Sequence, residues 1–317
     1  MAGNEITNTF NTYNAKGLRE DLTDVIWNVS PAETPFCTSI AKAKATNTYH
    51  EWQTDALAAA NTGNAQVQGD DITSFDAVTA TVRLGNRTQI SRKTMIISDT
   101  EEVGLKAGRK SEVAYQLAKK GRELRRDIEA ILLNNQAAVA SSAGVAPTLA
   151  GVPAWLITNT SEGAGGANPT GDGSNTRTDG TIRSISETFL KTVLQEVFTN
   201  AGDQPDLLLV PPALKASTSA FPGNATRFIN AESKEIIASV NLYSSDFGDL
   251  KIVPDRFMRT RDAMILNTDL WALAWYRPIK MVDLAQTGDA QKKMIICEYT
   301  LEARNELANG AVFDVGP

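Results

Sequence analysis

A long amphipathic helix is the feature that most limits the folds open to this sequence. Apolar positions alternate in steps of four and three, and charged residues fill the other side. The stripe consists of Leu117, Gly121, Leu124, Ile128, Ile131 and Leu132. It predicts a helix from about Arg109 to residues 135–140, roughly 45 Å long at about 1.5 Å per residue. This length exceeds the width of a small domain, which indicates that the helix is a strut in an elongated molecule.

A capping box precedes this helix. Ser98 is followed three residues later by Glu101, the pattern in which two side chains cap the first backbone N–H groups. Gly104 and Gly108 weaken the turns that follow, so the helix can break there. Arg125 and Glu129 are four residues apart on the expected charged side, where they can pair.

The region before the helix offers little material for a core of its own. The first 30 residues are rich in Asn and Thr, and Leu18, Leu22, Val25 and Ile26 give them one short amphipathic segment. Such an arm has too little apolar area to fold alone, so it must lie on its own body or on a neighbour.

Two strands are predicted at residues 47–60 and 77–97, with a loose polar tip between them. This long hairpin carries few large side chains, which suggests contact with another chain. Asp70, Asp71 and Asp76 at the tip are expected in solvent, where they could pair with a neighbour's Arg or Lys.

A compact α/β stretch follows a Gly-rich segment that we interpret as a flexible domain boundary. We expect a helix at 184–200, a strand at 206–210 and a helix at 213–220. A hairpin at 236–244 and 249–254 and strands at 263–266 and 270–282 follow. The last strands, KKMIICEYTLEARN and AVFDV, are expected to return to the long helix, with residues 184–290 inserted as a second domain.

Composition excludes several classes of protein. The net charge of −6 argues against a tight nucleic-acid binder. No apolar run is long enough for a transmembrane helix, and the polar start is not a secretory signal, so we expect synthesis in a cytoplasm. Cys37 and Cys297 fit two small buried hydrophobes in a reducing compartment, and a disulfide between them is left open.

No catalytic, cofactor-binding or metal-binding residue is predicted. The single histidine, His50, precedes Glu51, but a zinc site needs further ligands. A calcium loop starting at Asp172 would need Glu at its twelfth position, which is Arg183. The glycines at 163–173 lack the Gly-Lys-Ser/Thr of a phosphate loop, and no G-x-S-x-G motif occurs.

Two residue groups have a structural interpretation as well as a binding one. The basic residues of the long helix are interleaved with acidic ones, which favours a salt-bridged face or a subunit interface over a nucleic-acid grip. They are Lys119, Lys120, Arg122, Arg125 and Arg126. Trp271, Trp275 and Tyr276 form an aromatic group that we assign to the core or to an interface.

Several long segments resemble the major capsid proteins of tailed bacteriophages, whose fold is shared by bacterial encapsulins. They include DVIWNVSPAETPFCTSI, RTQISRKTMIISDTEEVG, GRELRRDIEAILLNNQ, TLAGVPAWLITN and MIICEYTLEARNELANGAV. The longest, VNLYSSDFGDLKIVPDRFMRTRDAMILNTDLWALAWYRPI, lies in the second half of the chain. Together they span almost the whole sequence in the expected order.

The resemblance implies an α+β tailed-phage major capsid fold with a long spine helix. Its parts would be an N-terminal arm at 1–35, an extended β-hairpin loop region at 36–95, a peripheral domain at 96–183 and 291–317, and an axial domain at 184–290. Such subunits form hexamers and pentamers in an icosahedral virion shell around double-stranded DNA, assembled in the host cytoplasm. Implied partners are other copies, a portal, and scaffolding or decoration proteins. DNA contact would be weak and non-specific, with no membrane, no cofactor and no enzymatic activity.

Three other functions compete with this one. An encapsulin-like nanocompartment subunit would need an inner groove for a cargo peptide. A hydrolase would need two carboxylates converging in a pocket. A decorating or tail-connector protein would fit a smaller β-rich chain without the strut helix.

Overall fold

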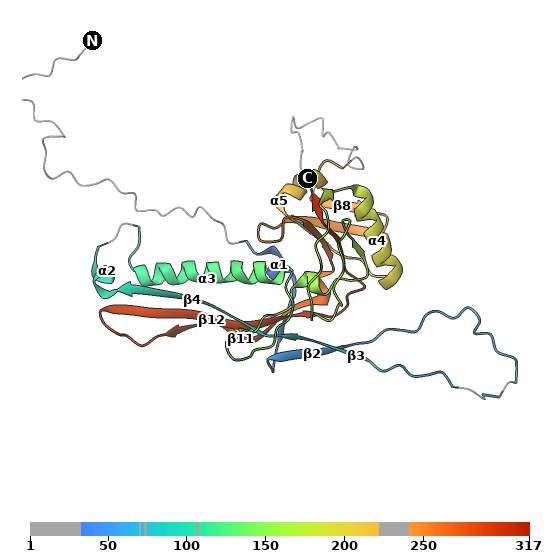
Figure 1. The fold of residues 1–317 in the computed structure, drawn as a ribbon, viewed down its shortest axis with the longest axis horizontal. Helices are drawn as coiled ribbons and strands as arrows, with labels where there is room; N and C mark the ends of the chain where they lie inside the picture. The colour runs from blue at the N-terminus through green and yellow to red at the C-terminus, as the bar shows by residue number, and fades with distance from the viewer. Residues whose placement is uncertain (1–32, 70, 73–74, 106–107, 222–240) are drawn as a thin grey trace, which may run out of the picture.

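Two larger β-sheets form most of the described part of the molecule, with a long helix along one of them and two additional two-stranded sheets. The computed structural model describes residues 33–69, 71–72, 75–105, 108–221 and 241–317. Helix α3 runs along the four-stranded sheet at one end, and the six-stranded sheet with helices α4 and α5 lies at the other (Figure 1). A loop projects away from both sheets, so the described part is elongated.

The predicted strut is helix α3 (Glu112–Leu132), and its buried stripe is confirmed. Leu124, Ile128 and Leu132 are at most 2% exposed. The helix is shorter than predicted, 21 residues or about 32 Å, and its cap differs. Ser111 accepts the N–H of Ala114 at its start, whereas the predicted capping serine begins a separate short helix, α2 (Asp99–Val103). The break falls in the glycine-containing connection, as anticipated.

The four-stranded sheet supports α3. Its strand order is β1-β11-β12-β4, with bounds β1 (Ala41–Lys44), β4 (Gln89–Ser98), β11 (Trp271–Asp283) and β12 (Ala290–Ala303). The predicted alternation in β12 is confirmed, because Ile295, Cys297, Tyr299, Leu301 and Ala303 all lie in the core cluster that contains the helix stripe.

The six-stranded sheet has the order β5-β13-β10-β7-β9-β8. Its strands are β5 (Thr160–Ser161), β7 (Leu207–Val210), β8 (Leu242–Ser245), β9 (Gly248–Pro254), β10 (Asp262–Leu266) and β13 (Gly310–Phe313). Strand β7 is apolar at every position because it serves two cores. Leu207 and Leu209 belong to the α3 cluster, while Leu208 and Val210 belong to the cluster of α4 (Glu187–Ala201) and α5 (Pro212–Thr218).

The remaining elements are short. They are α1 (Pro35–Ser39), β2 (Tyr49–Thr54), β3 (Val82–Arg87), β6 (Arg183–Ser184), β14 (Val315–Gly316) and the 3₁₀ turns η1 (Val152–Ala154) and η3 (Thr268–Leu270). The helices predicted at 184–200 and 213–220 and the strand at 206–210 are confirmed. Part of the predicted hairpin, 236–240, and the amphipathic arm segment lie outside the described residues.

Two strand predictions need correction. The stretch 77–97 is not one hairpin arm: β3 pairs with β2, and after Thr88 the chain joins the four-stranded sheet as β4. The final AVFDV strand does not return to α3 but pairs with β10 and β5 in the six-stranded sheet. Strand β11 pairs with β12 rather than with the other strands of 184–290. The division into arm, loop, peripheral and axial domains stays a prediction.

The Gly-rich segment is packed into the body and is not a flexible linker. A Cβ on Gly163 would lie 2.0 Å from the carbonyl oxygen of Thr181, and one on Gly180 would lie 2.5 Å from that of Gly163. Gly173, at φ +76°, lies against the ring of Trp155. These glycines permit close backbone approach instead of providing flexibility.

Candidate assembly surfaces

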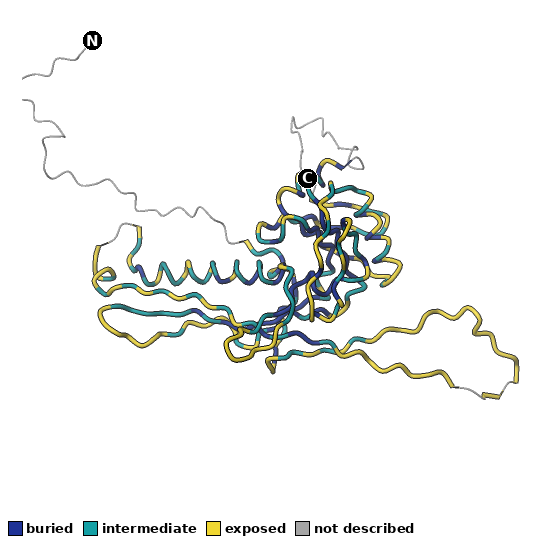
Figure 2. The backbone as a smooth tube through the Cα atoms, viewed as in Figure 1, coloured by how far each residue is buried: buried dark blue, intermediate teal, exposed yellow. Residues whose placement is uncertain are grey.

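The extended loop, residues 55–81, is the most exposed part of the described chain. It projects beyond β2 and β3 without regular structure, and nearly all its described residues are exposed (Figures 1 and 2). Its large apolar side chains are at least 75% exposed: Leu57, Val67, Ile72, Phe75 and Val78. The loop also contains four aspartates and no Lys, Arg or His. A contiguous apolar and acidic segment of this kind is typical of an interaction site.

The base of the extended loop is fixed to the body. The buried Asn86 amide of β3 donates to the carbonyl oxygens of Leu301 (2.9 Å) and Ala150 (3.2 Å), and its oxygen accepts the N–H of Ala150 (2.8 Å). Trp52 of β2 lies 5.4 Å, ring to ring, from the buried Trp155. The body therefore sets the direction in which the loop leaves it.

The four-stranded sheet has a free face on the side away from α3. Alternate residues of β4 are exposed there, including Ile90, Arg92 and Ile96, while Lys93 on the other side pairs with Asp127 of α3 at 2.6 Å. Ile296 of β12 is the neighbour of Arg92, and Lys280 of β11 is the neighbour of Ile296. We call this mixed apolar and basic surface the outer sheet face.

The buried carboxylate of Glu129 holds helix α1, near the first described residue, against α3. Glu129 of α3 accepts the N–H groups of Phe36 (2.6 Å) and Cys37 (2.8 Å) in α1. It is fully buried and does not lie on the charged side of the helix, which corrects the expected pairing with Arg125. Burial and the neighbouring Asp255 raise the pKa of Glu129 to about 7, although both N–H donors favour the charged form. Burial, followed by Glu129 itself, raises the pKa of the Cys37 thiol.

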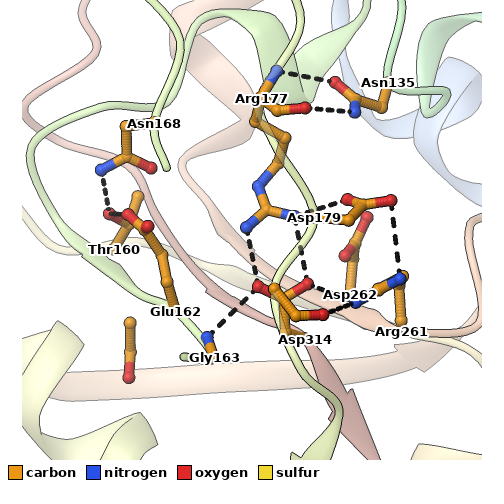
Figure 3. A network of polar contacts seen from close by, with 12 residues as sticks. Asn135, Thr160, Glu162, Gly163, Asn168, Arg177, Asp179, Arg261, Asp262 and Asp314 are labelled. Atoms are coloured by element: carbon orange, nitrogen blue, oxygen red, sulfur yellow. Dashed lines mark hydrogen bonds and ion pairs between the residues drawn. The ribbon is translucent and has the colours of Figure 1, made fainter. Parts of the chain in front are cut away.

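A second buried network joins the Gly-rich segment to the six-stranded sheet (Figure 3). The side chains of Arg177 and Asp314 are both inaccessible, with 2.9 Å between Arg177 Nη2 and Asp314 Oδ2. Arg261 Nη2 approaches the other oxygen of Asp314 to 2.8 Å, and the N–H of Gly163 donates to Asp314 Oδ2 at 3.2 Å. Asp179 also pairs with Arg177, at 2.8 Å.

Arg259 and Asp262, which pair at 3.1 Å, complete this network. Its charges balance, because it contains three arginines and three aspartates: Arg177, Arg259, Arg261, Asp179, Asp262 and Asp314. Burial alone would raise the pKa of Asp314, but hydrogen bonding and attraction from Arg177 outweigh it and hold that pKa below its usual range. For Asp262 burial prevails and raises the pKa to about 6. Buried charges that balance one another in this way fix geometry rather than perform chemistry.

The sequence-predicted candidates do not converge on an active site. His50 Nε2 lies 3.5 Å from Glu302, and Asp172 Oδ1 accepts hydrogen bonds from Thr170 and Ser174 within its own turn. Among the described residues, no group of three or more His, Cys, Asp and Glu is placed to hold a metal ion. None of the described helices is long and apolar enough to cross a membrane.

The aromatic and basic groups are distributed over different surroundings. Trp271 is buried and donates to Asn309, and the half-buried Trp275 packs against the same core cluster, whereas Tyr276 is exposed. Successive strand residues point to opposite faces, which separates Tyr276 from Trp275. In the basic group, Lys120 pairs with Glu123 and Arg126 lies over the ring of Phe257. Arg125 points into solvent near α1 and β11.

The sequence analysis did not predict the buried polar contacts of Asn86, Glu129 and the Arg177–Asp314 pair, because the sequence carries only weak signals for them. Each residue bonds to a segment at least 64 positions away, so no local spacing reveals the contact. The one hint is Glu129, an acidic residue directly after Ile128 of the buried stripe.

Comparison with known proteins identifies the family. Residues 5–316 match the SU10 major capsid protein family. The major capsid protein of Escherichia phage Phieco32 is 29% identical over 340 residues, covering 96% of both chains. Similar solved structures include a chain of the cyanophage A-1(L) capsid asymmetric unit (15% identity, TM-score 0.64, 98% of this chain and 99% of that one). A chain from Gordonia phage Cozz is also similar (11% identity, TM-score 0.63, 99% and 97%).

These relatives confirm the expected tailed-phage capsid fold and the structural, non-enzymatic role. They support an encapsulin-like compartment less, because both the family and the curated relative are phage capsid proteins. The chain belongs to the SU10 major capsid protein family and is a major capsid protein of a tailed phage.

Proposed function

We propose that copies of this chain assemble as hexamers and pentamers into a closed icosahedral shell around double-stranded DNA. The arm at 1–35, the peripheral domain at 96–183 and 291–317, and the axial domain at 184–290 are the parts of the subunit in this proposal. Assembly takes place in the host cytoplasm, with a portal and scaffolding or decoration proteins as helpers. The net charge of −6 supports weak, non-specific contact with the packaged DNA.

The extended loop of one copy binds the outer sheet face of its neighbour in this shell. One observation carries the proposal: the loop is acidic and apolar without a single cation, while the face is basic and apolar. Described residues Asp71 and Asp76 of the loop would meet cations such as Arg92 and Lys280. Loop side chains such as Phe75 would cover Ile90 and Ile96, which are 44% and 63% exposed in the single subunit.

Burial of apolar surface on both sides provides the attraction, and opposite charge fixes the orientation. Each contact is expected to be weak, because docking restricts the exposed side chains of the loop. Repetition over many subunits makes the shell stable without strong pairwise affinity. A loop fixed at its base by Asn86 loses less entropy on docking than one attached by a flexible linker.

A charge exchange tests the contact. The loop variant Asp71→Lys with Asp76→Lys and the face variant Arg92→Glu with Lys280→Glu should each assemble poorly, because like charges then meet. Combining all four substitutions in one chain should restore shells, as seen by negative-stain electron microscopy and light scattering. Lys251→Glu, an exposed strand lysine of β9, is the matched control and should assemble normally.

The combined variant decides the result. If it assembles no better than either parent while circular dichroism shows folded subunits, the loop does not meet this face. Normal shells from the face variant alone would contradict the proposal as well.

A further inference from the structure

A groove of about 370 Å³ lies where α1, α3, β1 and β11 meet. Its floor is apolar: Ile128 and Leu273 are buried there, and Trp275 and Ile279 remain partly exposed, Ile279 by 37%. Apolar side chains that converge in a concave site usually receive another apolar group. The groove is separate from the outer sheet face, because α1 and α3 form its walls.

Two cations stand at the rim of the groove. Lys42 of β1 and Arg125 of α3 both line it and are both exposed. Within the described part of the chain, neither has a carboxylate at ion-pair distance, whereas Lys120 on the same helix pairs with Glu123. The groove is therefore suited to an apolar segment that carries negative charge on its flank.

The sequence contains such a segment a few residues before those that line the groove. The described chain starts at residue 33, and Thr34 itself lines the groove, so residues 1–32 lead directly to it. Residues 18–26 have apolar Leu18, Leu22, Val25 and Ile26 at helical spacing. Between them lie Glu20, Asp21 and Asp24, with no cation after Arg19.

We propose that residues 18–26 bind in this groove of their own chain while the subunit is free. The apolar stripe would cover Trp275 and Ile279, and the acidic residues would meet Lys42 and Arg125. Ile26 precedes Thr34 by eight residues, a reach of at most about 28 Å when extended. A chain of that length can turn back, and the intervening WNVSPAE contains the turn-forming residues Asn28, Ser30 and Pro31.

Covalent linkage favours the chain's own segment over that of a second copy. A short tether gives an effective concentration in the millimolar range, far above that of free subunits in a dilute preparation. The inference goes beyond the proposed shell contacts, since it concerns the unassembled subunit and would hold whether or not the extended loop binds the outer sheet face.

Cysteine cross-linking in the dilute full-length chain tests the proposal. A Cys37→Ala background carries Thr23→Cys in the segment and Thr38→Cys at the groove, and mild oxidation followed by peptide mass spectrometry reports the disulfide. We expect an intramolecular 23–38 disulfide whose yield does not change on about tenfold dilution. The matched control pairs Thr23→Cys with Asp249→Cys, an exposed position on β9, and should give little product.

The alternative results are equally clear. Disulfide-linked dimers whose yield falls on dilution would show that the segment binds a second copy, and a yield no higher than the control would show that it does not bind the groove. Either result overturns the proposal. Circular dichroism of each variant confirms that the subunit is folded.

A charge exchange distinguishes recognition from mere proximity. Arg125→Glu should reduce the cross-linking yield several-fold, and Asp21→Arg with Asp24→Arg added to it should restore the yield. An unchanged yield with Arg125→Glu would contradict the assigned contact, because a segment that is only tethered nearby would not respond to the charge.

Discussion

Replacing Asp314 with Asn should destabilise the subunit strongly without changing its backbone. Asp314 has a φ of 58°, in the left-handed region where Asn is also tolerated, so the substitution adds no backbone strain. It has nearly the same volume, but it removes the negative charge and replaces one of two acceptor oxygens, both of which face N–H donors, with an NH₂ group. Arg177, whose side chain is fully buried, would then keep only Asp179 as a carboxylate partner.

The expected cost follows from the burial of the pair. Removing one partner of a buried ion pair leaves an uncompensated charge and typically costs about 3–5 kcal/mol. Asp179 is 34% exposed and compensates Arg177 only in part, so we expect the lower end, about 3 kcal/mol. With a urea slope of about 3 kcal/mol per molar, the unfolding midpoint should fall by about 1 M.

The assay is urea unfolding of the free subunit, followed by tryptophan fluorescence. Lys191→Ala is the control, since Lys191 is 59% exposed and makes a surface ion pair with Glu187, for which we expect less than about 1 kcal/mol. An Asp314→Asn midpoint within that control's range would refute the reasoning, because the network would then contribute no more than a surface pair.

The pH dependence gives a second check. Arg177 holds the pKa of Asp314 below its unfolded value, so the carboxylate contributes stability above about pH 4 that is lost as the pH falls. Asp314→Asn should therefore lose this part of the acid sensitivity. A wild-type and variant that respond identically below about pH 4 would contradict the assignment.

Three further predictions concern other parts of the subunit. The pKa of Glu129 is raised from 4.5 to about 7, so with rising pH the carboxyl loses its proton first in the unfolded chain. The free energy of unfolding of the wild type should therefore fall as the pH rises between those two values. Urea unfolding at several pH values should show that Glu129→Gln lacks this decline. Gly163→Ala should destabilise the subunit by about 1–3 kcal/mol, because the new Cβ would collide with the carbonyl oxygen of Thr181. Gly121→Ala should stabilise the subunit by up to about 1 kcal/mol, because the space around Gly121 in α3 is open. Thermal unfolding of both variants checks that the two effects have opposite signs. Deleting residues 61–73 should leave the unfolding midpoint unchanged but abolish most shells in electron micrographs, and normal shells would count against the role of the extended loop.

The elements with a strong local pattern could be predicted from the sequence. The stripe of α3 and the alternation of β12 are periodic, and each has one face buried in the same core. The apolar run of β7 followed by Pro211 also marks a buried strand and its end. These features depend only on which side of an element is apolar.

The partners of charged residues could not be predicted in the same way. Arg177 and Asp314 are 137 positions apart, and Glu129 is 93 positions from Phe36, so their pairing depends on the finished fold. Glycine content was misleading for a related reason. A flexible linker and a tightly packed segment have the same composition, and only the neighbours of Gly163 distinguish them.

The change of sheet at Thr88 is hidden because Leu84, Thr88 and Ile90 all fall on even positions of the sequence, although Leu84 and Thr88 lie against the body and Ile90 is exposed. Residues on both sides of Thr88 read as one strand, while the backbone exchanges its partner from β2 to β12. For the same reason, the sequence could not separate the extended loop's stem from the sheet that follows it.

The route of the chain through the two sheets limits how the subunit can deform. After β4 in the four-stranded sheet the chain enters the six-stranded sheet, returns for β11 and β12, and leaves again for β13. No single connection can act as a pivot, because bending at one crossing would strain the other two. Neighbouring copies that meet at different angles must therefore accommodate the difference in the segments outside the two sheets, such as the extended loop. We expect the two sheets to move together as one rigid body.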